Sequence, residues 1–209
     1  MLFSSIPFLY YFLPLVLAVY FLVPRGLKNA VLFASSLLFY AWGEPRFCLF
    51  MLLSILQGYV FGRLIEKNAE NRKWSKIFLT ASVLLSLGLL GYCKYADFFI
   101  SSLNAVTGLS LKLLRVALPI GISFYTFQIL SYVVDVYRRD VPAQKSFLKL
   151  GTYIAMFPQL IAGPIVKYRD VSNQLHVYKH RYTLLQIEEG MTLFTFGLAK
   201  KVLLADAIG

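Results

Sequence analysis

The stretch LPIGISFYTFQILSYVVD, residues 118–135, combines an apolar segment with a regular series of polar positions. Small or polar residues recur along it at intervals of four and three: Gly121, Tyr125, Gln128, Tyr132 and Asp135. On an α-helix this spacing places all of them within one stripe about 80° wide. Because lipid solvates such a stripe poorly, we expect it to point into the protein or toward a water-filled space.

Two interpretations of this polar face are open. The face lines a path for a polar ligand, or its side chains hydrogen-bond the helix to its neighbours, each contact contributing about 0.6 to 2 kcal/mol. The residue pattern does not decide between them. The candidate lining residues are Tyr125, Gln128, Tyr132 and Asp135.

Apolar runs of membrane-spanning length surround this stretch. The chain of 209 residues is 58% hydrophobic and only 15% charged, with a mean hydropathy of +0.66, whereas soluble domains are about 25% charged. Residues 98–106 are too short to cross a bilayer and indicate an interfacial helix. The sequence therefore predicts an all-α, polytopic integral membrane protein with five to seven spanning or re-entrant helices. The predicted spans are 6–23, 27–42, 47–62, 77–93 and 116–137.

Basic residues gather in the gaps between these runs. The chain has 21 Lys and Arg against 10 Asp and Glu, a net charge of +11. In a soluble protein this balance would suggest nucleic-acid binding, but basic loops are typical of the cytoplasmic face of a membrane protein. If the amino terminus is outside, the gaps at 24–28, 63–76 and 138–149 face the cytoplasm with eleven basic residues, against four outside. We therefore expect an extracytoplasmic amino terminus and no nucleic-acid partner.

The segment 147–166 does not fit a simple crossing. Pro158, Gly163 and Pro164 interrupt its second half, where the missing amide donors need compensation by protein or water. A full crossing would also place the basic residues Lys167 and Arg169 on the outer face. We therefore expect a broken or re-entrant helix that returns to the cytoplasmic side and lies beside a cavity.

The residues alone do not name a reaction. His176 and His180 are four residues apart, but no HExxH glutamate lies between them and their surroundings are polar and basic, which favours solvated loop histidines over a metal pair. We therefore expect no metal site. Nucleophile elbows, phosphate-binding glycine loops and dinucleotide fingerprints are absent from the sequence.

The sequence is similar to the membrane-bound O-acyltransferase family at two long motifs. These are residues 118–137 and FPQLIAGPIVKY, residues 157–168. Within the family, the chain most resembles the branch that O-acetylates bacterial exopolysaccharides such as alginate. The branch that transfers D-alanine to teichoic acids shares the general pattern and is the alternative. Shorter matches are FYAWGEPR at 39–46, KYADFF at 94–99 and GLAKKVLLAD at 197–206.

The resemblance implies transfer of an acyl group from a cytoplasmic donor, expected to be acetyl-coenzyme A, to hydroxyls of an extracytoplasmic polysaccharide. It implies a multi-pass protein of the bacterial inner membrane that works with an extracytoplasmic acetyl-transfer protein of a polysaccharide biosynthesis complex, without a bound cofactor. The candidate lining residues would then border the acyl path. Lys167 and Arg169 would attract the phosphates of the donor.

No catalytic residue is assigned in this chain. The family places its essential histidine in an apolar segment downstream of these motifs, and neither His176 nor His180 matches that position. We therefore expect residues 1–209 to be an amino-terminal portion of one transmembrane domain of this type. A non-catalytic membrane scaffold and a transporter are the remaining alternatives.

Overall fold

The computed structural model describes residues 5–116, 118–160, 166–172, 175 and 183–205. This part of the chain is built of helices and contains no strand, which confirms the all-α prediction. The α-helices are α1 (Leu13–Leu22), α2 (Lys28–Gly43), α3 (Cys48–Lys67), α4 (Arg72–Thr107), α5 (Ile122–Arg138), α6 (Phe147–Ala155), α7 (Phe157–Leu160), α8 (Tyr168–Val171) and α9 (Leu184–Lys200).

The chain separates into two compact units, Met1–Val31 with His176–Gly209, and Leu32–Leu175. In the first unit, a π-helical stretch, Pro7–Phe12, leads directly into α1. Helix α9 begins with a capping box, in which Thr183 and Gln186 exchange hydrogen bonds with each other's backbone amides. This device satisfies two amides that a helix start would otherwise leave unpaired.

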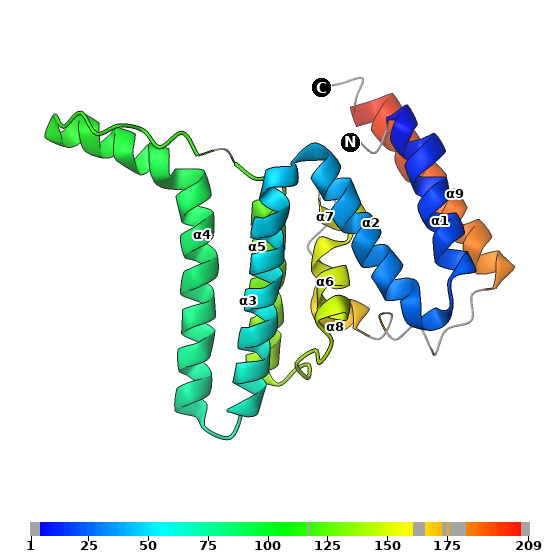
Figure 1. Ribbon diagram of the computed structural model, residues 1–209, viewed down its shortest axis with the longest axis horizontal. Coiled ribbons are helices and arrows are strands. Elements are labelled where there is room, and N and C mark those ends of the chain that lie inside the picture. The colour runs from blue at the N-terminus through cyan, green and yellow to red at the C-terminus, as the bar shows by residue number, and fades with distance from the viewer. Residues whose placement is uncertain (1–4, 117, 161–165, 173–174, 176–182, 206–209) are drawn as a thin grey trace. The chain divides into compact units, whose positions relative to one another are not determined.

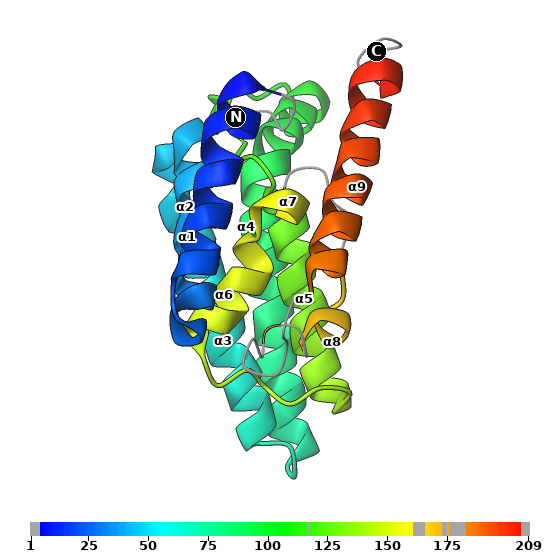
Figure 2. The ribbon, with the colours of Figure 1, turned by 90° about the vertical axis from the view of Figure 1, so that its right-hand side faces the viewer.

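The second unit is organised around α3, α4 and α5, which run side by side (Figures 1 and 2). Helix α3 together with the short 3-10 turn before it, Pro45–Lys67, is long and apolar enough to cross a membrane, and so is α4. They are joined by a turn of only four residues, so the predicted charged gap 63–76 is mostly helical. Asn71 caps α4 by accepting a hydrogen bond from the Trp74 amide. Together with the relatives described below, these helices identify a membrane protein.

Two glycines let α3 approach α5 closely. Gly58 and Gly62 are one turn apart, the spacing of small residues at membrane helix contacts. A Cβ atom built on Gly58 would lie 2.9 Å from Ile129, and one built on Gly62 would lie 2.8 Å from the ring of Tyr132. The face of α5 that carries Tyr132 therefore packs directly on the α3 backbone.

The end of α4 leaves the bundle. The helix continues without a break through residues 98–106, which the sequence had indicated as a separate interfacial helix, but this part bends and points away from the bundle (Figure 1). The chain then folds back along it. Asp97 accepts hydrogen bonds from the amides of Leu114 and Arg115, at 2.7 and 3.2 Å. These contacts fix the returning irregular segment to the helix.

Helix α5 begins later than the sequence predicted. The span was expected from residue 116, but the helix starts at Ile122, and Gly121 is its left-handed N-cap with φ of +74°. Pro119 and this glycine account for the late start, because a left-handed residue ends helical geometry. Gly121 is therefore not on the helical stripe to which its spacing assigned it.

The broken helix is confirmed. Helix α6 ends at Ala155, and Met156 has a non-helical backbone before the single turn of α7. The Leu160 carbonyl oxygen lies 3.0 Å from a Cβ built on Gly121, at the start of α5. The chain then comes back, because the Tyr153 hydroxyl donates to the Val166 carbonyl at 2.7 Å. Segment 147–168 therefore rises beside α5 and returns, while residues 161–165, with Gly163 and Pro164, lie outside the described residues.

Candidate functional site

The inner face of α5 is the centre of the candidate site. Tyr125, Gln128 and Tyr132 are at most 1% exposed, so the spacing correctly predicted an inward-facing stripe. The hydroxyl of Tyr125, Oε1 of Gln128 and Oδ2 of Asp135 are buried without a hydrogen-bond partner in the described part of the chain. Buried polar atoms are nearly always paired, so these three can still take hydrogen bonds that the described residues do not supply.

The half of the stripe that carries Tyr132 is closed by Gln144, which the sequence analysis missed. The Gln144 backbone amide donates to the Tyr132 hydroxyl at 2.8 Å, and its side-chain Nε2 donates to the Tyr168 hydroxyl at 2.7 Å. Gln144 lies in the irregular connection between α5 and α6, so no helical periodicity could have marked it. This one residue ties the helix to the returning chain.

Three tyrosine rings pack at the same point. The ring centroid of Tyr168 lies 5.0 Å from that of Tyr132 and 5.2 Å from that of Tyr153, each in an edge-to-face arrangement. Burial raises the pKa of Tyr168, and the hydrogen bond from Gln144 acts in the opposite direction. Tyr168 therefore stays a neutral phenol near neutral pH and fixes where the re-entrant segment returns.

A second polar group lies at the other end of α5, and the sequence analysis missed it as well. Tyr125 is within electrostatic range of Tyr40, Cys93 and Glu44, which come from α2, α4 and the turn after α2. The Tyr40 hydroxyl is also buried without a partner among the described residues. Glu44 accepts a hydrogen bond from the Ile120 amide at 2.9 Å. The signal for these residues was the FYAWGEPR motif, in which Tyr40 and Glu44 both occur.

The candidate donor-entrance residues lie near the last stripe residue. Lys167 and Arg169 are exposed on either side of the buried Tyr168, and both act electrostatically on the Asp135 carboxyl. The Nε atom of Arg169 also lies 3.7 Å from Oδ1 of Asp170. The fold thus brings the two basic residues to the end of the stripe that Asp135 marks, as their assignment to a donor entrance requires.

The chemistry available at Tyr125, Gln128 and Tyr132 is hydrogen bonding. Phenol and amide groups can hold an ester carbonyl or a hydroxyl in place, but they are poor bases near neutral pH. Within the described ranges, no group of three or more His, Cys, Asp or Glu side chains could hold a metal ion. His176 and His180 lie outside the described residues.

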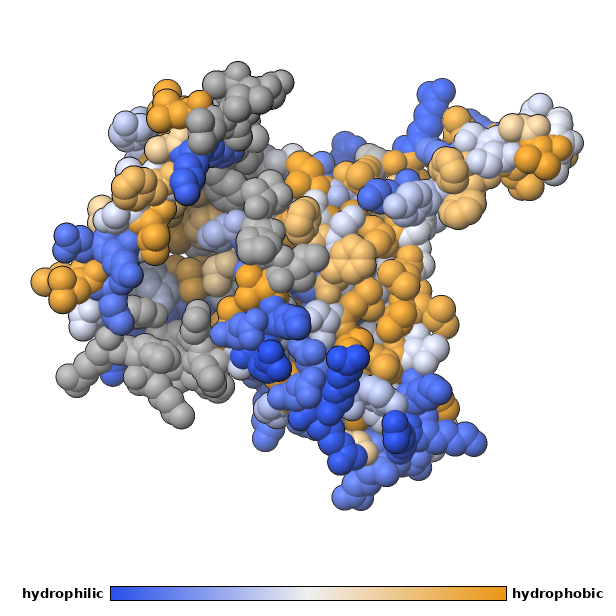
Figure 3. Space-filling view, turned by 180° about the vertical axis from the view of Figure 1, so that it is seen from behind, coloured by the Kyte–Doolittle hydropathy of each residue, from blue (hydrophilic) through white to orange (hydrophobic). Residues whose placement is uncertain are grey.

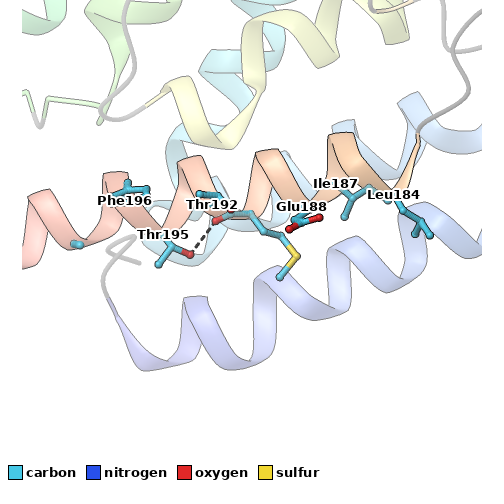
Figure 4. Close-up of a pocket in the computed structure, with 8 residues that line it drawn as sticks. Leu184, Ile187, Glu188, Thr192, Thr195 and Phe196 are labelled. Carbon is cyan, nitrogen blue, oxygen red and sulfur yellow. Dashed lines mark hydrogen bonds between the residues drawn. The ribbon is translucent and has the colours of Figure 1, made fainter.

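The face of α9 forms a shallow hollow of about 570 Å³ that a single helix lines (Figure 4). Most of the side chains are apolar, Glu188 is the charged one, and the Thr195 hydroxyl donates to the Met191 carbonyl at 2.8 Å. None of the candidate residues lies there. The lining residues are Leu184, Ile187, Glu188, Met191, Thr192, Thr195, Phe196 and Ala199.

The comparisons with known proteins point to one group. The whole chain aligns with the probable alginate O-acetylases of Pseudomonas syringae, at 39% identity, and Azotobacter vinelandii, at 40% identity. The chain is a homologue of these O-acetylases. It is also 28% identical, over 99% of its length, to a peptidoglycan O-acetyltransferase of Helicobacter pylori. No protein-family model matches the chain, and no solved structure is significantly similar.

The chain spans about two-fifths of the length of these relatives: 40% for the Pseudomonas syringae protein, 42% for the Azotobacter vinelandii protein and 45% for the Helicobacter pylori protein. The alginate O-acetylase homologues therefore support the resemblance to O-acyltransferases that the motifs at 118–137 and 157–168 indicated. The inner face of α5 and the segment beside it are regions that this homology includes.

Proposed function

We propose that this chain is part of a membrane O-acetyltransferase that transfers acetyl groups to hydroxyls of an exopolysaccharide such as alginate. The observation that carries the proposal is homology along the whole chain to proteins named probable alginate O-acetylase. The buried polar atoms on α5 that have no partner among the described residues add a physical reason, because they can hydrogen-bond a passing group.

The reaction requires a path and a base. A new bond forms between the acetyl carbonyl carbon and the sugar oxygen, the bond to the thiol sulfur breaks, and the hydroxyl proton passes to a base. In this proposal Tyr125, Gln128, Tyr132 and Asp135 border the path and hydrogen-bond the passing groups. The re-entrant segment, which packs against both α3 and α5, provides a further wall of the path. The base is none of the residues assigned in this chain.

The donor is proposed to be acetyl-coenzyme A, which enters beside Lys167 and Arg169. Both side chains are exposed at the end of the stripe and can attract the phosphates of the donor. In the complete enzyme, Lys167→Ala with Arg169→Ala should weaken donor binding by about tenfold at low salt, since two exposed charges are lost. Lys94→Ala, at the other end of the bundle, is the control. Unchanged donor affinity in the double variant would remove these residues from the entrance.

The proposed location is the bacterial inner membrane, with the amino terminus outside and the basic end of the α3–α5 bundle in the cytoplasm. The basic residues of 63–76 and 138–149 lie at one end of this bundle (Figure 3), where Arg139 donates to the Ala69 carbonyl, and this clustering supports the assignment. An extracytoplasmic acetyl-transfer protein and the polysaccharide itself are the proposed partners.

The acceptor is the main alternative. The peptidoglycan O-acetyltransferase relative favours a second polymer, but its identity of 28% is below the 39% and 40% of the alginate relatives. Each of these three relatives carries an acetyl-transfer name, which supports acetyl over D-alanyl transfer and an enzyme over a scaffold or a transporter.

The test is a deletion of the gene in its own host, followed by measurement of ester-linked acetyl on both exopolysaccharide and peptidoglycan. Loss from exopolysaccharide, restored by complementation, is the expected result. Loss confined to peptidoglycan would change the acceptor, and loss from neither polymer would contradict the function. Complementation with Gln128→Leu tests whether the polar face takes part.

A further inference from the structure

A hollow of about 490 Å³ lies at the basic end of the bundle, between the α3–α4 turn and the end of α5. Its floor is buried, with Ile65, Ser75 and Val136 each at most 5% exposed. Three arginines and one glutamate surround the opening. The lining residues are Ile65, Ala69, Glu70, Arg72, Ser75, Val136, Tyr137, Arg138 and Arg139.

The three arginines form no ion pair in the part of the chain that the structure describes. Arg72, Arg138 and Arg139 have no carboxylate within salt-bridge distance in the described ranges, where the ion pairs are Arg63 with Glu66 and Arg169 with Asp170. Arginine guanidinium groups are suited to bidentate recognition of phosphate and carboxylate. The hollow therefore carries an excess of positive charge around a small buried floor.

The start of α4 adds to this preference for an anion. Arg72 and Lys73 occupy its first turn, which contains no acidic residue, although the positive end of the helix dipole disfavours cations there. The buried Ser75 on the floor of the hollow carries a hydroxyl that can donate a hydrogen bond to an anion. A bound anion would accept from this hydroxyl and offset the repulsion at the helix start.

The geometry of Arg139 is consistent with a built site. Its backbone is left-handed, with φ of +66°, a conformation that non-glycine residues adopt uncommonly. Arg139 takes this conformation as the C-cap of α5, and its guanidinium donates to the Ala69 carbonyl across the α3–α4 turn. The end of α5 is thus joined to the α3–α4 turn at one side of the hollow.

The position of the hollow indicates where the anion comes from. Trp74 is 51% exposed and stacks on Phe78, and exposed tryptophan is enriched at the headgroup level of membranes. An apolar surface begins directly above the hydrophilic end of the bundle (Figure 3). We propose that the hollow binds the phosphate group of an anionic lipid headgroup, which holds the α3–α4 turn against the end of α5.

The experiment uses the intact membrane protein, purified and reconstituted in phosphatidylcholine nanodiscs, with phosphatidylglycerol added as the probe. Phosphatidylglycerol should raise the unfolding temperature and remain bound in native mass spectra. Arg72→Gln with Arg138→Gln should weaken its apparent affinity by about tenfold. The control, Lys67→Gln with Lys76→Gln, removes the same charge from exposed positions at the same end of the bundle outside the hollow and should change the affinity less than about twofold.

Three outcomes would overturn the proposal. Equal weakening by both double variants would show general surface attraction. Inorganic phosphate or coenzyme A could displace phosphatidylglycerol from the unmodified protein at concentrations that leave it bound to the control variant. That result would assign the hollow to a soluble phosphate. An unaltered affinity in the arginine variant would also contradict it. Arg72→Lys guards against misfolding, because it keeps the charge and should keep most of the lipid preference.

Discussion

Two glutamines inside the α3–α5 bundle show how differently its interfaces use polar groups. Gln57, on α3, donates to the carbonyl and hydroxyl of Ser82 at 2.9 and 3.1 Å and exchanges hydrogen bonds with the Ser86 hydroxyl at 3.1 Å. Gln128, on α5, is 1% exposed and its Oε1 has no partner among the described residues.

The two interfaces differ in how far their polar groups satisfy one another. Polar groups between α3 and α4 are paired with each other, which is the form that helix-to-helix hydrogen bonding takes in membranes. On the inner face of α5 the Tyr132 hydroxyl accepts from Gln144, whereas Tyr125, Gln128 and Asp135 each keep a buried atom without a partner among the described residues. Such atoms are the ones that can still bind a polar ligand, so the comparison tests the proposed path.

The largest expected effect comes from adding a methyl group where α3 and α5 touch. Gly62→Ala would place a Cβ 2.8 Å from the Tyr132 ring, and overpacking of this kind costs about 1–3 kcal/mol. Gly88→Ala, on α4, is the matched control, since nothing lies within 4 Å of its Cβ position. Thermal unfolding in detergent measures both. Equal stability of the two variants would show that α3 and α5 do not pack through Gly62.

The two glutamines provide the next test. Gln57→Leu should lower stability by about 1–2 kcal/mol, because it leaves Ser82 and Ser86 without their partner. Gln128→Leu should change stability by less than about 0.5 kcal/mol, yet lower polymer acetylation roughly tenfold, the loss of one hydrogen bond to a ligand. Ester-linked acetyl is measured on the complemented strains, and unfolding midpoints on the variants purified from the same strains. If Gln57→Leu lowered acetylation and Gln128→Leu lowered stability, the roles of the two interfaces would be exchanged.

The smallest effects are expected at the tyrosines around Gln144. Tyr132→Phe and Tyr168→Phe each remove one acceptor and should each cost about 1 kcal/mol. Their effects should not add, because both hydrogen bonds are made by Gln144 and residues of one network couple. Tyr92→Phe, at a position 52% exposed on α4, is the control. A strictly additive double variant would contradict the shared network.

Sequence periodicity predicted the inner face of α5 because a helix repeats every 3.6 residues and the polar positions follow that repeat. It failed at the ends of helices. Gly121 shares the spacing but is an N-cap, and residues 98–106 continue α4 because no proline or glycine stops it before Gly108.

Sequence periodicity could not predict contacts between distant parts of the chain. The pairing of Gln144 with Tyr168 depends on how the re-entrant segment returns, and the grouping of Tyr125 with Tyr40 and Glu44 depends on how α2 packs. Proline and glycine did predict the break near Pro158, because both residues act locally on the backbone. The contributions of the lining residues and of Lys167 and Arg169 to acyl transfer stay predictions.

The close approach of α3 and α5 has a consequence for how the protein is made. Helix α5 has 17 residues, about 26 Å at 1.5 Å per residue, and its inner face would be costly in bare lipid. The glycine face that receives it belongs to α3, which with α4 precedes it in the chain, and α6 and α8, which also pack on α5, follow it. During synthesis, α5 therefore gains its shelter in two stages: first from a hairpin already in the bilayer, then from the chain that emerges after it.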